Sequence, residues 1–376
     1  MQNRTIVNRC VCAAFAAGML VAGMAAADGK PAPETELGRL AASMQPGELK
    51  KLNTKNYNWD LLKSHYEWEN SSGARNGYQI ICWSNDADWD PVTQQLFYYG
   101  LGHYASPKFV AYSASSNAWR VLELPPWSDA RKRKDKRWPV GHSYDRNALS
   151  VEHRLYAVNW NGLHLYNIDS NTWSYARGSG AGGKDAFQVC EYFPAMKGFP
   201  YEANWGRHLK FWNAETGKNR SLGSHPFGIH GVMEYNPVHK VMVFGAGDIK
   251  DRAHPGFFLI NAKGKVSKLK PPPVHINCTE KSMFVCDPVS GEYIVKDRKT
   301  RHIYAYHPIR DEWKELSVRF PSGMAASVPD HGVIMFCPMV KGFSGSKPHH
   351  CLLYKHKRQW PEEESEPQDD LSGRTQ

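Results

Sequence analysis

The chain has 376 residues and a formal net charge of +10, and because residues 362–370 alone hold six acidic side chains, the remainder is more basic than the total suggests. No nucleic-acid-binding motif accompanies this charge, so we expect no nucleic-acid partner. Beyond the first 27 residues no segment is apolar enough to cross a bilayer, and we expect no membrane span.

Residues 1–27 have the composition of a Sec-type signal peptide. Two arginines precede an apolar stretch from Val11 to Ala26, and small residues end just before Asp28. We expect the leader to be removed and the mature protein to be secreted or periplasmic. Residues 28–54 are predicted to form a polar lead-in.

A spacing of seven residues recurs along the rest of the chain, from an aromatic or aliphatic residue to a tryptophan or its replacement. The pairs are Tyr112/Trp119, Tyr166/Trp173, Trp212/Asn219, Leu259/Val266 and Tyr306/Trp313. The later member recurs at intervals of 54, 46, 47 and 47 residues, and one further step of 47 reaches Trp360. Six units of one supersecondary type therefore follow one another.

Each unit has room for about four short strands and no long helix. Four units contain a turn with proline followed by an apolar run. The turns are 90–93, 235–238, 287–291 and 328–332, and the runs are 96–99, 241–244, 293–295 and 333–336. The third and fourth strands are predicted to flank the seven-residue spacing, joined by polar hairpin turns.

Sheets of this kind bury both faces when they are arranged radially. We therefore predict an all-β fold, a β-propeller of six or seven four-stranded blades that forms one domain over residues 55–360. Residues 45–75 add either a blade or only the closing strand. Residues 361–376 are predicted to be a disordered acidic tail.

The repeat resembles that of kelch and galactose-oxidase-type propellers over roughly residues 76–360. The resemblance rests on a period of about 40–50 residues and on the late step from an aromatic residue to tryptophan. Gly245-Ala246-Gly247 is the nearest counterpart of the kelch double glycine.

Propeller geometry predicts a common location for the histidines. The loops that lead into strand 1 and those between strands 2 and 3 open on the same face, around the central funnel. His142 and His230 precede a first strand. One histidine in each of five successive blades precedes or begins a third strand: His164, His208, His254, His302 and His350. These five are either a structural residue of the repeat or imidazoles for proton transfer or metal binding.

Blades two and three resemble the active site of β-propeller polysaccharide lyases of the ulvan-lyase kind. The matching residues are His142, His164 and Arg207. The resemblance implies β-elimination in a uronate-containing acidic polysaccharide, with Arg207 neutralising the carboxylate and His142 or His164 taking the C5 proton. A tyrosine would assist the leaving oxygen, and Tyr192 and Tyr144 are the candidates. Catalysis of this kind requires no cofactor.

Substrate binding is predicted at aromatic and histidine side chains near these positions. Trp160 and Trp205 are the candidate stacking platforms, with blade packing as the alternative. Tyr144, His208 and His230 complete the predicted set. We expect a monomer with an anionic polysaccharide as partner. The alternative function is a non-catalytic kelch-like propeller that binds glycan or protein.

Six cysteines remain after removal of the leader, and an even number permits disulfides of undetermined connectivity: Cys82, Cys190, Cys278, Cys286, Cys337 and Cys351. Buried unpaired thiols are the second possibility. A structural zinc site is the third, and its predicted ligands are Cys278, Cys337 and His275.

Overall fold

The computed structural model describes residues 34–63, 79–100, 107–128, 142–160, 162–176, 189–203, 208–248, 256–340 and 349–357. Contacts divide the chain into Met1–Glu34 and Thr35–Gln376, and the fold belongs to the second unit. The predicted signal peptide and the acidic tail lie outside the described residues. Among the described residues, none of the helices has the length and apolar character needed to span a bilayer.

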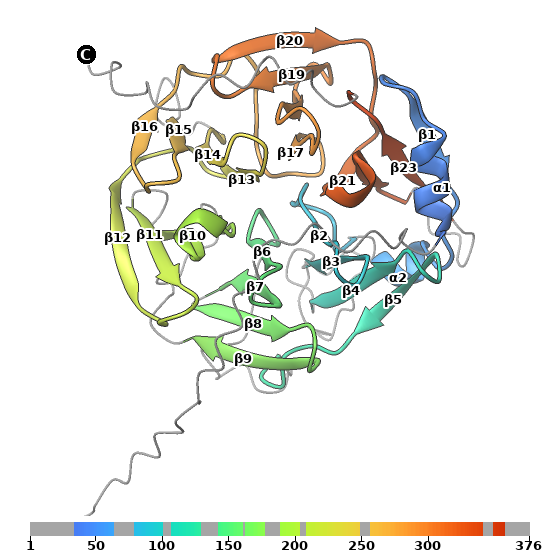
Figure 1. Cartoon of the computed structure of the whole chain (residues 1–376), viewed down its shortest axis with the longest axis horizontal. Coiled ribbons are helices and arrows are strands. Elements are labelled where there is room, and N and C mark those ends of the chain that lie inside the picture. The colour runs from blue at the N-terminus through green and yellow to red at the C-terminus, as the bar shows by residue number, and fades with distance from the viewer. Residues whose placement is uncertain are drawn as a thin grey trace, which may run out of the picture. The chain divides into compact units, whose positions relative to one another are not determined.

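Antiparallel strands form six sheets around a centre, and we number the strands of each blade from the innermost outward (Figure 1). Blade one consists of β2 (Asp88–Asp90), β3 (Gln95–Gly100), β4 (Lys108–Ser113) and β5 (Ala118–Leu122). Blade two consists of β6 (Asn147–Ser150), β7 (Leu155–Asn159), β8 (Leu163–Asn167) and β9 (Thr172–Ala176). Blade three contains β10 (Gly198–Ala203), β11 (His208–Asn213) and β12 (Asn219–Ser224). In blade three, the innermost position is taken by a segment that joins β10 through isolated bridges, Cys190 to Tyr201 and Phe193 to Gly198.

Blades four to six continue the pattern. Blade four consists of β13 (Val232–Asn236), β14 (Val241–Gly245), β15 (Phe257–Ile260) and β16 (Val266–Lys268). Blade five consists of β17 (Met283–Cys286), β18 (Tyr293–Lys296), β19 (Ile303–His307) and β20 (Glu312–Leu316). Blade six consists of β21 (Gly323–Val328), β22 (Val333–Pro338), β23 (Cys351–Tyr354) and β1 (Leu49–Leu52). Among the described residues, four short helical segments accompany the strands: α1 (Glu36–Ala42), α2 (Trp59–Leu62), η2 (Pro194–Met196) and η3 (Pro329–His331). The predicted β-propeller is confirmed with six blades, within the expected range.

The ring closes through β1, which comes from the N-terminal part of the chain. It pairs antiparallel with β23, from Leu49 opposite Tyr354 to Leu52 opposite Cys351, as the outermost strand of blade six. The described part of the segment 45–75, residues 45–63, therefore supplies the closing strand, and the described strands form six blades. This strand lies within residues 28–54, which the sequence predicted to be a polar lead-in. The propeller therefore includes residues that precede its predicted start at residue 55. Trp360, the expected end of the sixth unit, lies outside the described residues.

The seven-residue spacing corresponds to a cross-strand pair between the third and fourth strands. Tyr112 lies opposite Trp119, Tyr166 opposite Trp173, Trp212 opposite Asn219 and Tyr306 opposite Trp313. Blade four differs, because Val266 lies opposite Ile260 and Leu259 lies opposite Ser267. Paired side chains of this kind stabilise the hairpin, and the rings of Tyr306 and Trp313 stack at 4.3 Å.

The core is divided into six clusters, one between each pair of neighbouring blades. Strand β14 shows the cause. Val241 and Val243 pack toward blade five, whereas Met242 and Phe244 pack toward blade three. Because successive side chains of a strand point to opposite faces, each blade buries both of its faces against its neighbours.

Candidate functional site

Side chains from blades one, two, four and five meet on one face of the ring. They come from loops that lead into a first strand or that follow a second strand, and in an antiparallel sheet these loops lie at the same end. Trp83, His142, Tyr144, His230, His275 and Asn277 belong to the first kind, and Asp248 and Arg298 to the second. His142 and His230 thus occupy the positions predicted for them.

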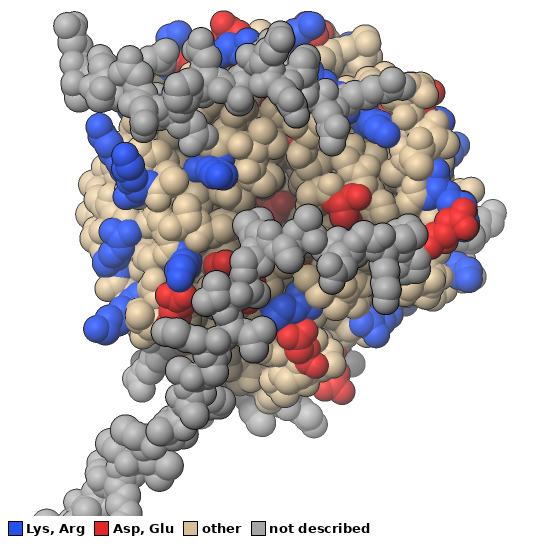
Figure 2. All heavy atoms as spheres, viewed as in Figure 1, with Lys and Arg blue, Asp and Glu red and all other residues tan. Residues whose placement is uncertain are grey.

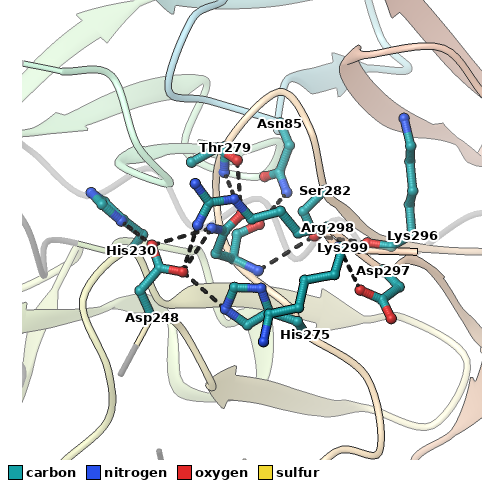
Figure 3. Close-up of polar contacts among 11 residues, drawn as sticks. Asn85, His230, Asp248, His275, Thr279, Ser282, Lys296, Asp297, Arg298 and Lys299 are labelled. Atoms are coloured by element: carbon teal, nitrogen blue, oxygen red, sulfur yellow. Dashed lines mark hydrogen bonds and ion pairs between the residues drawn. The ribbon is translucent and has the colours of Figure 1, made fainter. Parts of the chain in front are cut away.

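Asp248 is the hub of this site, as Figure 3 shows. Its Oδ2 accepts a hydrogen bond of 2.6 Å from His230 Nδ1. Its Oδ1 lies 2.9 Å from His275 Nε2 and 2.7 Å from Arg298 Nη1. Asn277 Nδ2 lies 3.2 and 3.3 Å from the two carboxylate oxygens. One carboxylate therefore holds four side chains from two blades.

The contacts of Asp248 also set its charge. Burial alone would raise its pKa, but hydrogen bonds from His230 and His275 and the positive charge of Arg298 outweigh it and hold that pKa well below the usual range. Asp248 is therefore ionised at neutral pH. Its hydrogen bond assigns a proton to Nδ1 of His230, which leaves Nε2 as the acceptor nitrogen of the neutral ring.

A second pair, His142 and Tyr144, lies beside His230. A ring nitrogen of His142, Nδ1, is hydrogen-bonded to the Tyr144 hydroxyl. The indole of Trp83 stacks on His142 with ring centres 4.8 Å apart and lies 5.6 Å from His230. Tyr144 lies 5.1 Å from His230. Two histidines with different oxygen partners, a phenol and a carboxylate, are thus joined by two aromatic rings.

The backbone of the site is held in an unfavourable conformation. Trp83, Tyr144 and His230 have φ values of 66°, 50° and 61°, in the left-handed region that bulky residues rarely adopt. Hydrogen bonds fix the loops, because Trp83 N donates to Glu280 Oε2 at 2.9 Å and Tyr144 N donates to Trp83 O at 2.8 Å. Such conformations persist where the surrounding structure determines them, and they are common at functional sites.

His164 lies on the same face but is buried, with 1% of its surface exposed. Trp127 Nε1 donates to its Nδ1 at 2.8 Å, and its Nε2 lies 2.8 Å from the carbonyl oxygen of Trp160. Both ring nitrogens are therefore engaged inside the blade. Trp160 is only 6% exposed and packs on the Arg146 guanidinium at 4.3 Å. The structure places both residues in the packing of blade two.

Tyr192 lies at the opposite end of blade two from His142. Its hydroxyl contacts Glu152 and lies 3.0 Å from His153 Nδ1, in the turn between β6 and β7. His142 precedes β6, at the other end of that strand. The structure therefore does not bring Tyr192 to His142 or His164. Tyr144, the alternative tyrosine, is the one that contacts His142.

Two of the remaining predicted residues, His208 and His302, are separate from the Asp248 hub. His208 begins β11 and is exposed, and His302 Nδ1 lies 2.8 Å from Glu315 of the outermost strand β20. These positions on the third strand lie farther from the centre than the first strands (Figure 1). Arg207, Trp205 and His254 lie outside the described residues.

The predicted zinc ligands are not brought together. Cys278 packs between blades four and five, Cys337 between blades six and one, and His275 binds Asp248. In the part of the chain that the structure describes, no three His, Cys, Asp or Glu side chains are arranged to hold a metal ion. The six cysteines there carry free, buried thiols.

Carboxyl groups of the innermost strands form another cluster, near the central axis. Its members come from blades one to four: Asp86, Asp88, Asp145, Glu191 and Glu234. Burial raises the pKa of Asp86 to about 7, and burial together with neighbouring carboxylates raises the pKa of Asp145 and Glu234 well above the usual range. Glu234 also accepts a hydrogen bond from the Cys286 amide at 3.1 Å. Asp145 and Glu234 therefore hold protons at neutral pH, and Asp86 is partly protonated there.

The six sheets define the chain as a six-bladed β-propeller. No family model matches the sequence, and no curated protein matches it. Solved structures that resemble it include three chains. A nidogen/laminin complex chain has a TM-score of 0.45 and 12% identity over 73% of this chain and 93% of that one. TolB from Acinetobacter baumannii has a TM-score of 0.44 and 10% identity, over 73% of this chain and 64% of that one. A Bacteroides thetaiotaomicron protein of unknown function has a TM-score of 0.49 and 10% identity, over 82% of this chain and 75% of that one.

Proposed function

We propose that the protein is an exported polysaccharide lyase that cleaves a uronate-containing acidic polysaccharide by β-elimination. The observation that carries this proposal is the presence of two histidines that both contact Trp83 and Tyr144, one of them bound to a carboxylate and the other to a phenol. Elimination requires a base for the C5 proton and an acid for the leaving oxygen. His230 and His142 are suited to these two roles by their different partners.

His230 is the proposed base. Asp248 holds its Nδ1–H, so the lone pair on Nε2 takes the C5 proton, the C5–H electrons form the C4=C5 double bond, and the C4–O bond breaks. His142 is the proposed acid. In its imidazolium form His142 donates Nδ1–H to the Tyr144 oxygen, and the proton on Nε2 passes to the departing oxygen, which leaves a neutral imidazole. Tyr144 is then a positioning residue.

Arg298 is the proposed partner of the uronate carboxylate. Negative charge spreads into that carboxylate when C5 loses its proton, and a fixed cation stabilises the transition state. Arg298 is held by Asp248 and its side chain is 29% exposed. Arg207, which the resemblance to ulvan-lyase-type propellers assigns to this role, is a second candidate. The half-buried Trp83 is the proposed stacking platform for a sugar ring.

The charge of the protein supports an acidic polymer as substrate. The chain has a net charge of +10, and on the face shown in Figure 2 the Lys and Arg side chains lie mainly around the rim. A basic surface raises the local concentration of polyanions and speeds their association.

The test is to incubate the purified protein with a panel of uronate polysaccharides and to follow the near-ultraviolet absorbance of the unsaturated product. We expect His230→Asn and His142→Ala to lower the rate roughly 10²–10⁴-fold. His302→Ala is the matched control, because this histidine contacts only the outer strand, and it should retain activity. Absence of product from every polymer, or unchanged rates in both site variants, would overturn the proposal. Binding without cleavage would favour a glycan-binding propeller.

A further inference from the structure

Cys337 and Cys351 lie on neighbouring strands of blade six. In the antiparallel pairing of β22 with β23, Phe336 lies opposite Leu352, and one further step in this register places Cys337 opposite Cys351. Opposed residues of an antiparallel pair have Cα atoms about 4.5–5.5 Å apart. Disulfide-bonded cysteines have Cα atoms about 4.4–6.8 Å apart, so the backbone already has a suitable separation.

The two side chains also point to the same face of the sheet. Both belong to the core cluster between blades six and one, whereas their neighbours Phe336 and Leu352 belong to the cluster on the other face. Both thiols are fully buried. Burial, and after it the interaction with Cys351, raises the pKa of Cys337 well above its usual range. The two thiols are therefore neighbours within one cluster.

The other cysteines lack this arrangement. Cys286 lies opposite Tyr293, and Cys190 is bridged to Tyr201. Cys278 precedes β17, whereas Cys286 is the last residue of that strand. Among the described cysteines, the pair in blade six is the one that the strand register places face to face.

We propose that Cys337 and Cys351 form a disulfide bond when the chain folds in an oxidising compartment. Two S–H bonds break and one S–S bond forms, and the two protons and two electrons pass to the disulfide of an oxidised thiol compound or oxidoreductase, which becomes a dithiol. Since burial disfavours the reactive thiolate in the folded protein, the bond forms during folding, before β22 and β23 are packed.

This bond would tie together the two ends of the connection between β22 and β23. The C-terminal end of β22 corresponds to the ends of the second strands β14 and β18, after which Asp248 and Arg298 follow. The disulfide would also reinforce the strand to which the closing strand β1 is paired. The inference is independent of the proposed lyase activity.

The test refolds the full chain in a buffer of reduced and oxidised glutathione, then alkylates the remaining thiols and maps the peptides by mass spectrometry. We expect a linked pair of peptides containing Cys337 and Cys351. Alkylation of both cysteines after oxidative refolding, or linkage of either to a different cysteine, would overturn the proposal. The mapping uses the wild-type chain, so it decides the question even where a variant fails to fold.

Thermal unfolding provides the second measurement. We expect dithiothreitol to lower the Tm of the oxidised protein by about 5 °C. The double variant Cys337→Ala/Cys351→Ala should have a Tm that does not respond to dithiothreitol. Cys286→Ala, which removes an equally buried thiol, should keep the full response. A Tm response that survives in the double variant would contradict the assignment.

Discussion

Asp248 is the residue on which the candidate site depends most. Four neighbours contact its two oxygens, and three of them, His230, His275 and Arg298, are able to carry positive charge. The pairing keeps the carboxylate ionised, and the ionised carboxylate in turn orients His230. The charge of one side chain therefore determines which nitrogen of a histidine is available for chemistry.

Replacement of Asp248 by asparagine tests this dependence. The amide keeps the shape of the side chain but loses the charge, and it can donate a hydrogen bond to Nδ1 of His230, which would move the ring proton to Nε2. We expect kcat to fall about 100-fold, with a smaller change in KM. Steady-state kinetics on the cleaved polymer provide the measurement. Equal kcat in the variant and in the wild type would contradict the role of Asp248.

Some individual residues of the candidate site could be predicted from the sequence, and others could not. His142 and His230 could be predicted because their positions before a first strand follow from the repeat. Asp248 and Arg298 could not, since a carboxylate or a guanidinium after a second strand has no distinguishing motif. Their contact joins residues of different blades, which only the closed ring brings together.

Among the elements, the short strand β1 has the largest effect on the architecture. It covers the outer edge of β23, which would otherwise expose unpaired backbone groups. Leu52 is its fully buried residue, whereas Lys51 is exposed. The strand therefore contributes both backbone hydrogen bonds and one apolar contact to the cluster between blades six and one.

Leu52→Ala should destabilise the protein through the cavity that it leaves in this cluster. We expect the free energy of unfolding to fall by about 2–5 kcal/mol, as for other fully buried leucines. Lys51→Ala on the same strand is the control and should change it by less than about 0.5 kcal/mol. Urea unfolding measures both. A similar effect of the two substitutions would indicate that β1 contributes little to the closed ring.

The elements were largely predictable where a pattern recurs. The pairs Tyr112/Trp119 and Tyr306/Trp313 mark a hairpin directly, because cross-strand neighbours are separated by a constant number of residues. Asp90 and Asp287 cap the predicted turns through Thr93 and Ser290. The four residues of β1, Leu-Lys-Lys-Leu, contain no such pattern, so the sequence left their role open between a blade and a closing strand.

In the whole molecule, the buried carboxyl groups near the axis make stability depend on pH. Their pKa is higher in the folded state than in the unfolded state, so the folded protein binds more protons between about pH 4 and pH 7. In that range the free energy of unfolding falls as pH rises. Asp248 and Glu292 have the opposite effect, because their lowered pKa gives stability that is lost as pH falls below about 4.

We therefore expect the protein to be more stable near pH 5 than near pH 8. Urea unfolding in buffers of equal ionic strength measures the difference. Asp86→Asn should flatten the dependence, since the amide carries no titrating proton, whereas Glu123→Gln, at an exposed carboxylate, should leave it unchanged. Stability that stays constant or rises from pH 5 to pH 8 would contradict the assignment of protons to this cluster.

Closure of the ring by β1 also has a consequence for the order of folding. The segment Leu49–Leu52 leaves the ribosome early, but its partner Cys351–Tyr354 is made only after all the other described strands. In the closed ring β1 pairs with β23, so this strand remains unpaired until residues 351–354 have been made. Contacts of such long sequence separation form slowly, and the chain is most exposed to aggregation during this interval. Chains truncated before residue 351 should therefore be recovered mainly as insoluble protein.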